Sequence, residues 1–279
     1  MAKLKKFLLM IKDNKQLRNG LILLTIILII ALLAPILSTH DPFELYDDIL
    51  KAPGSTYLLG TDGLGRDVFS GVLYGARTSI LVGVIAATIS AIIGIIIGGI
   101  AGFFGGKTDL IVSEIINIFL MLPTFFLILI VVALFGSNML NMMIIIGLTT
   151  WTSNAKLMRA QALSLKERTF IKAQTTLGKS KVRILLEHII PNGIFPIIAN
   201  TTMNISQAIL LESSLSFLGL GDPNLISWGQ MVFHGKSYLV NGWWVSTFSG
   251  AAIVITVLAF YLIGDGLNNI LNPKLKAKK

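Results

Sequence analysis

Six long apolar segments constrain this sequence more than any other feature. About 20 helical residues cross a bilayer core about 30 Å thick. Because lipid offers no hydrogen-bonding partner to backbone groups, such segments must be helical. The sequence therefore predicts an all-α, polytopic membrane protein with six transmembrane helices. The predicted spans are Gly20–Leu37, Ala76–Phe104, Leu110–Phe135 (interrupted by Pro123), Leu140–Met158, Ile189–Leu211 and Val245–Ile263.

The composition excludes several other classes of protein. The 279 residues are 54% hydrophobic and only 13% charged, about half of the charged share of about 25% in soluble domains. An ordinary cytosolic enzyme, a disordered chain and a nucleic-acid module are therefore excluded. Cysteine is absent, which excludes disulfides, a thiol nucleophile and cysteine-ligated metals. The three histidines lack partners at metal-ligand spacing, so we expect no metal site and no cofactor.

The basic residues are distributed unevenly along the chain and so predict a topology. Of the 23 Lys and Arg residues, 19 lie before the first span, at 107, between 156 and 183, or after the last span. Most acidic residues, including Glu212, fall in the other loops. By the positive-inside rule, both termini and the loop between spans four and five are cytoplasmic. The positive charge then faces the anionic inner leaflet of the cytoplasmic membrane, and no nucleic acid is expected as a partner. We read the first span as a retained anchor rather than a signal peptide.

Three triplets, at 106–108, 178–180 and 235–237, resemble the end of a phosphate-binding loop. A full loop needs a further glycine five residues upstream, so that backbone amides can surround the phosphates. Those positions hold Ala101, Ala173 and Gln230. We therefore do not expect this chain to bind ATP.

Polar and small residues recur at helical spacing within two of the spans. Asn200, Asn204 and Gln207 share one face of the fifth span. Amides are costly in lipid, so these three either form hydrogen bonds between helices or line a polar translocation path. In the second span, small residues from Gly83 to Gly106 lie on one face, which favours close helix packing, or a face that slides during gating.

The polar stretch between spans four and five reads as two short cytoplasmic helices. The first ends at Gly178, where a left-handed cap is easily formed. The second, Lys179–Ile190, leads into the membrane at Pro191. The length and charge of this stretch suit a docking surface for a cytoplasmic partner, and the alternative is a solvated loop.

This stretch resembles the Glu-Ala-Ala…Gly…Ile-x-Pro loop of ABC importer permeases. In that family the loop forms a coupling helix that sits in a cleft of the ATP-binding subunit. Two departures are evident, because Lys172 stands in place of the usual acid and Gln174 in place of the second alanine. The resemblance assigns coupling to Phe170, Ile171, Lys172, Ala173, Gln174, Leu177, Gly178, Arg183 and Pro191.

Further motifs are similar to those of the dipeptide/oligopeptide/nickel permeases, in particular the second of their two permease subunits. The motifs together span most of the chain. They are Leu59–Ser70, Tyr74–Ser79, Gly102–Asp109, Leu215–Gly221 with Trp228-Gly229, and Gly264–Leu267 followed by Asn272–Lys274.

The resemblance implies a permease subunit with the type I ABC importer fold and no catalysis of its own. Its implied partners are a homologous permease, two ATP-binding subunits and an extracytoplasmic substrate-binding protein. The implied substrate is a di- or oligopeptide, with nickel or a nickel chelate as the alternative. The implied parts are a leader, anchor and outer loop (1–75), a permease domain (76–265) with a coupling loop (159–188), and a basic tail (266–279). A stand-alone secondary transporter or channel is the rival class.

Overall fold

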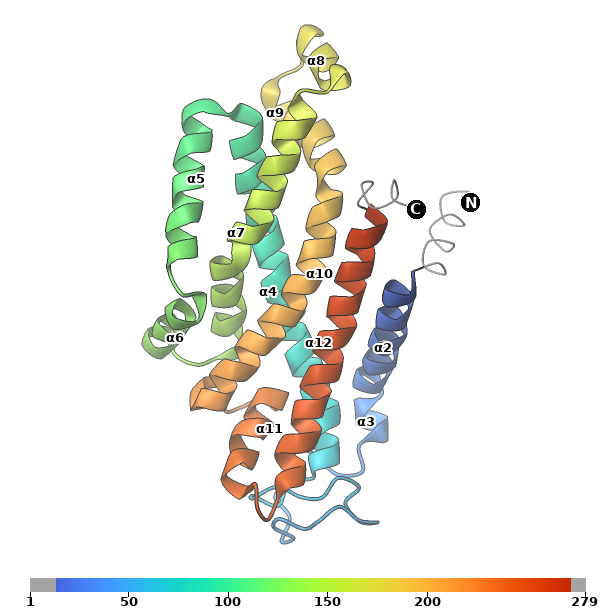
Figure 1. Cartoon of the computed structure of the whole chain (residues 1–279). Coiled ribbons are helices and arrows are strands. Elements are labelled where there is room, and N and C mark those ends of the chain that lie inside the picture. The colour runs from blue at the N-terminus through green and yellow to red at the C-terminus, as the bar shows by residue number, and fades with distance from the viewer. Residues whose placement is uncertain (1–13, 272–279) are drawn as a thin grey trace.

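The computed structural model describes residues 14–271, which form a bundle of long helices (Figure 1). Within that range the chain has no strands, only one isolated bridge between Thr61 and Asp67. The helices are α2 (Lys15–Leu32), α3 (Ala34–Leu37), α4 (Val68–Phe104), α5 (Gly106–Met121), α6 (Thr124–Phe135), α7 (Met139–Lys166), α8 (Thr169–Thr176), α9 (Lys181–Ile184), the π-helix η1 (Leu185–Ile189), α10 (Ile190–Leu215), the π-helix η2 (Ser216–Leu220), α11 (Trp228–Gly235), the 3-10 helix η3 (Lys236–Tyr238) and α12 (Trp243–Leu271).

Four of these described helices are long and apolar enough to cross a membrane: Lys15–Leu32, Val68–Phe104, Lys181–Leu220 and Trp243–Ile270. A fifth candidate is the pair α5 and α6, which is bent by 82°. The bend follows from Pro123, whose ring restricts the residue before it and removes a backbone donor. The predicted span Leu110–Phe135 is therefore not one straight helix.

The predicted fourth span, Leu140–Met158, lies inside the continuous helix α7. This helix is not among the candidate spans, because its polar run from Thr149 to Asn154 and Lys156 lower its mean hydropathy. The first predicted span differs too, since α2 begins at Lys15 and breaks at Leu33, just before Pro35.

The helices alternate in direction, and two groups of segments lie at opposite ends of the bundle. The tip formed by α8 lies at one end, and the first turn of α2 and the last turn of α12 are directed toward that end (Figure 1). At the other end lie α3, α11 and the segment 38–67.

Glycines bring α4 and α7 into close contact. A Cβ atom built on Gly94 would lie 2.5 Å from the Asn154 Cβ, and one on Gly98 would lie 2.9 Å from the Ala155 carbonyl carbon. One on Gly102 would lie 2.8 Å from the Ala162 Cβ. The predicted close packing through small residues is therefore confirmed at these positions.

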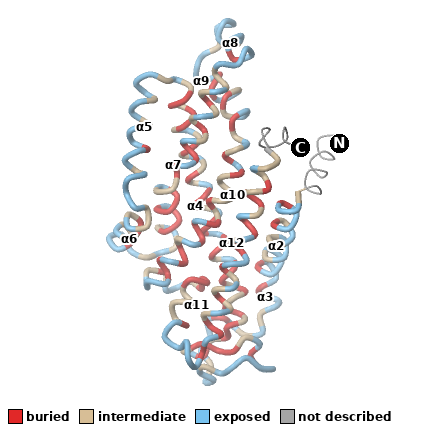
Figure 2. The backbone as a smooth tube through the Cα atoms, viewed as in Figure 1, coloured by how far each residue is buried: buried red, intermediate tan, exposed pale blue. Residues whose placement is uncertain are grey.

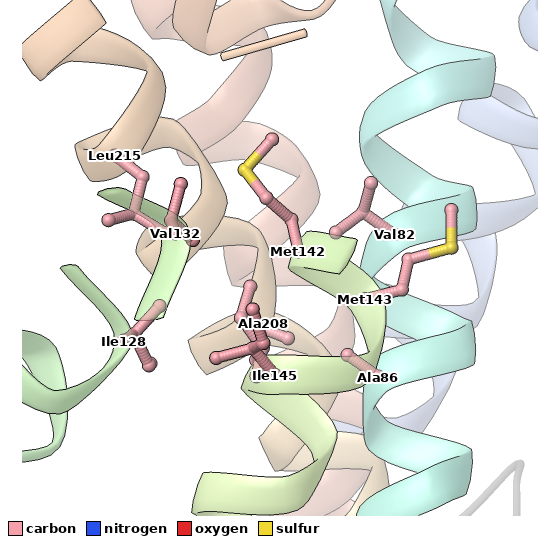
Figure 3. Packing of buried hydrophobic residues seen from close by; sticks show 10 residues of the cluster. Val82, Ala86, Ile128, Val132, Met142, Met143, Ile145, Ala208 and Leu215 are labelled. Atoms are coloured by element: carbon pink, nitrogen blue, oxygen red, sulfur yellow. The ribbon is translucent and has the colours of Figure 1, made fainter. Parts of the chain in front are cut away.

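Apolar side chains from four helices fill the space between them (Figure 3). Val82 and Ala86 come from α4 and Ala208 from α10, while Met142 and Ile145 from α7 pack between them. Figure 2 shows that buried residues concentrate on α4, α7, α10 and α12, whereas α5 is largely exposed. This core holds α10, which carries the candidate path residues, against α4 and α7.

Candidate functional site

The short helix α8 ends in a left-handed glycine cap, as predicted. Gly178 has φ +76°. Its N–H donates to the Thr175 carbonyl at 3.1 Å, and the Lys179 N–H donates to the Gln174 carbonyl at 3.2 Å. These two bonds form a Schellman motif, which satisfies carbonyls that the helix leaves unpaired. The chain therefore reverses sharply at Gly178 and returns toward the bundle.

One buried side chain fixes α8 to the bundle, and its neighbours point outward. Ile171 is 2% exposed and packs in a cluster with Met158 and Ile184. Phe170 is 45% exposed and Leu177 is 77% exposed. Large apolar side chains at a protruding tip are typical of a surface that a partner covers.

The second predicted cytoplasmic helix does not stop at Pro191. Instead α9, η1, α10 and η2 follow one another in a single run, Lys181–Leu220, whose helical backbone continues until a kink at Gly219 (φ +84°). The reason is a π-turn, in which the Ile190 N–H donates to the Leu185 carbonyl. Proline lacks an N–H, and an expanded turn beside it accommodates the missing bond without ending the helix.

Ion pairs cover part of the exposed surface around α8. Lys172 Nζ lies 3.0 Å from Glu167 Oε2. The Lys172 ammonium donates a hydrogen bond to this carboxyl and so holds the pKa of Glu167 below its ordinary value. Glu187 accepts from Lys179 at 3.2 Å and from Arg183 at 2.7 Å. Lys172, which replaces the usual acid, therefore has an acidic partner within its own chain.

Two of the three predicted path residues form hydrogen bonds between helices. Asn200 Nδ2 donates to Asn154 Oδ1 at 2.9 Å and to Ser153 Oγ at 3.3 Å. Asn204 Nδ2 donates to Ser153 Oγ at 3.4 Å. Gln207 lies about one turn further along α10 and is exposed. The amides at 200 and 204 thus join α10 to α7, which is the first of the two predicted alternatives.

A model of the family described as "Binding-protein-dependent transport system inner membrane component" matches residues 94–277. The chain belongs to this family. It is therefore a multi-pass permease of the inner membrane and a transporter subunit rather than an enzyme. This assignment argues against the rival class of a stand-alone secondary transporter or channel.

Named relatives match the permease over nearly its whole length. The dipeptide transport system permease protein DppC of Alkalihalophilus pseudofirmus is 36% identical over 269 residues, which cover 96% of this chain and 88% of the relative. The oligopeptide transport system permease protein OppC of Bacillus subtilis is 36% identical over 276 residues, which cover 98% of this chain and 90% of the relative.

A solved structure of the inward-facing MetNI methionine ABC transporter contains a chain of the same fold. The TM-score is 0.57 at 17% identity, and the match covers 72% of the permease and 96% of that chain. This likeness confirms the expected fold of an importer permease.

The structure also reveals two polar contacts that the sequence did not predict. Arg159 on α7 forms a two-point ion pair with Asp109 on α5, with contacts of 2.5 and 2.7 Å. Glu212, expected in an outer loop, is instead buried in α10 and accepts a hydrogen bond from Ser216 Oγ at 2.8 Å. The spacing of Ser216 four residues after Glu212 was the only local signal of this contact.

Proposed function

We propose that this permease imports di- or oligopeptides across the cytoplasmic membrane, driven by ATP hydrolysis in separate subunits. Relatives that match almost the entire chain carry the names of dipeptide and oligopeptide permeases, which supports a peptide substrate over nickel. The proposed partners are a homologous permease in a heterodimer, two ATP-binding subunits, and an extracytoplasmic substrate-binding protein.

The observation that carries this proposal is the shape of α8. A single buried residue, Ile171, anchors it, while Phe170 and Leu177 remain exposed at the end of the bundle. The rigid cap at Gly178 fixes how the two apolar side chains are presented. A short, protruding helix of this shape fits into a cleft of an ATP-binding subunit, and it can transmit a movement of that subunit to α10.

For the topology we propose six spans with both termini cytoplasmic. The bent pair α5 and α6 and the helix α7 supply the two spans beyond the four clear candidates. The basic residues around α8, and the direction of α2 and α12 toward the same end, support this orientation (Figure 1). The division into 1–75, 76–265 and 266–279 is part of the same proposal, although residues 1–13 and 272–279 lie outside the described range.

Uptake by the reconstituted complex tests the substrate. Proteoliposomes that contain both permeases, the ATP-binding subunits and the binding protein should accumulate labelled di- or oligopeptide only when ATP is supplied. Transport of nickel without peptide would overturn the peptide assignment. Peptide uptake by the permeases alone, without ATP-binding subunits, would overturn the ATP-driven mechanism.

Removing the apolar tip should weaken attachment of the ATP-binding subunits. In the double variant Phe170→Ala, Leu177→Ala, we expect affinity to fall by about tenfold or more, because buried aromatic anchors dominate interfaces. The affinity is measured by titrating ATP-binding subunits onto the permeases in nanodiscs. Val240→Ala is the matched control, since Val240 is an exposed apolar residue in the short segment between η3 and α12. This segment follows α11, which lies at the end of the bundle opposite to α8 (Figure 1). An equal loss in both variants would contradict docking at α8.

We also propose that Asn200, Asn204 and Gln207 border the translocation path, with the hydrogen bonds of the first two holding α10 in one state. Single variants with cysteine at each position are informative because the chain has no cysteine. A charged thiol reagent reacts only where water reaches. We expect labelling at 207 and nucleotide-dependent labelling at 200 or 204. Ile198→Cys, exposed on the apolar side of α10, should stay unlabelled. Absence of labelling at all three positions in both nucleotide states would discard the path.

A further inference from the structure

The surface around α8 carries an excess of positive charge. Between residues 166 and 187 there are six basic and two acidic residues. Both acids already have partners in the chain, Glu167 with Lys172 and Glu187 with Lys179 and Arg183. Within residues 14–271, Arg168 and Lys181 form no ion pair. The segment that carries the exposed apolar side chains of α8 therefore has a net positive charge.

The pair between Lys172 and Glu167 is suited to exchange. Both side chains are mostly exposed, at 62% and 66%. Exposed ion pairs add little to stability, because water screens them and two long side chains must be held in place. Lys172 can therefore leave Glu167 for another carboxylate without unfolding α8, which Ile171 and the Gly178 cap hold independently.

We propose that the partner surface receiving α8 has an apolar floor and a carboxylate-lined rim, and that Lys172 exchanges Glu167 for a rim carboxylate on docking. The inference rests on the proposed function, in which that partner is the ATP-binding subunit. Lys172 then selects the partner by charge, while Phe170 and Leu177 supply contact area. The exchange leaves Glu167 in solvent, where its carboxylate is well hydrated.

An anionic lipid surface is the other class of partner that positive charge could suit. A protein cleft is favoured because α8 is carried beyond the ends of α5 and α10 (Figure 1). In addition, three of the six basic residues precede the sharp turn at Gly178 and three follow it, so they do not form a stripe along one long helix. Complementary charge at a rim chiefly increases the rate of association and its dependence on salt.

A charge swap separates pairing within the chain from pairing with the partner. In Lys172→Glu, affinity for ATP-binding subunits should fall about fivefold at low ionic strength, and the difference should shrink at high salt. The double variant Glu167→Lys, Lys172→Glu restores an ion pair inside the chain but keeps the reversed charge at 172. We expect it to bind as weakly as the single variant. Glu167→Gln, which frees Lys172, should bind as tightly as the unaltered chain or more tightly.

The measurement is a titration of ATP-binding subunits onto full-length permeases in phosphatidylcholine nanodiscs, repeated in phosphatidylglycerol. Recovery of affinity in the double variant, or no loss in Lys172→Glu, would overturn the proposal. A loss confined to phosphatidylglycerol would assign Lys172 to lipid and overturn it too. If the unaltered permeases bind no ATP-binding subunit, the proposed function itself fails. If the unaltered permeases bind ATP-binding subunits, and only the double variant Phe170→Ala, Leu177→Ala loses this binding, the proposed exchange of carboxylates by Lys172 is wrong while docking at α8 stands.

Discussion

Gly178→Val is expected to separate ATP hydrolysis from uptake. Gly178 has φ +76°, a conformation that is an outlier for a β-branched residue and costs about 1–2 kcal/mol even for an ordinary one. Relief of this strain breaks the two cap bonds to Thr175 and Gln174 and tilts α8. We expect uptake to fall about tenfold or more, while ATP hydrolysis by the bound subunits continues.

Uptake and substrate-stimulated ATP hydrolysis should be measured on the same proteoliposomes. Gly136→Val is the matched control, because Gly136 has φ +91° and, like Gly178, nothing within 4 Å of its Cβ position. It lies between α6 and α7, away from α8. With ψ 154°, Gly136 lies in a region that is essentially restricted to glycine, so valine there causes backbone strain at least as large. This strain lies outside the proposed docking surface, so coupling should persist. Normal coupling in Gly178→Val would remove α8 from the mechanism.

Gly98→Ala is expected to lower the stability of the permease strongly. The new Cβ would lie 2.9 Å from the carbonyl carbon of Ala155 and closer still to its oxygen. Backbone atoms cannot rotate out of the way as a side chain can, so α4 and α7 must move apart to admit the methyl group. Overpacking of this kind costs about 3 kcal/mol, or about 10 °C in Tm for a chain of this size.

Gly99→Ala provides a control one residue away. The same methyl group there would meet the Leu185 Cδ1 at 3.5 Å and the Met158 Cε at 3.7 Å. These are ordinary van der Waals distances, so Tm should change by no more than about 2 °C. Thermal unfolding of the detergent-purified complex measures both variants. Similar melting of the two would show that α4 and α7 are not packed as closely as described.

The predictions that held depend on signals within a few residues. The end of α8 follows from Gly178 alone, because glycine adopts the left-handed cap without a steric penalty. The close approach of α4 and α7 follows from Gly94, Gly98 and Gly102, which leave one face of a helix without side chains. Both features are local, so the sequence contains them.

Three features were not predicted from the sequence. One depends on an unusual local turn of the helix, and the other two depend on contacts between distant segments. Pro191 indicated the end of the short helix Lys179–Ile190, yet the π-turn at Leu185–Ile189 lets the helix continue through it. Glu212 looked like a solvated acid, but α4, α7 and the segment after α10 cover it. Asp109 and Arg159 are 50 positions apart, and only the packing of α5 beside α7 brings them together.

The helical run that starts at Lys181 and continues through two prolines as far as Leu218 has a mechanical consequence. At about 1.5 Å per residue, its helical part forms a rod about 57 Å long, with one end beside α8 and the other close to Gly219, where the backbone turns left-handed (φ +84°) before α11. A rod pivoted near its middle converts a push at one end into an opposite swing at the other. Its weakest points against bending are the turns around Pro191 and Pro196, both in the half nearer α8. A movement that passes these two prolines would therefore reach Gln207 and the end of the run nearer α11 as a rigid tilt.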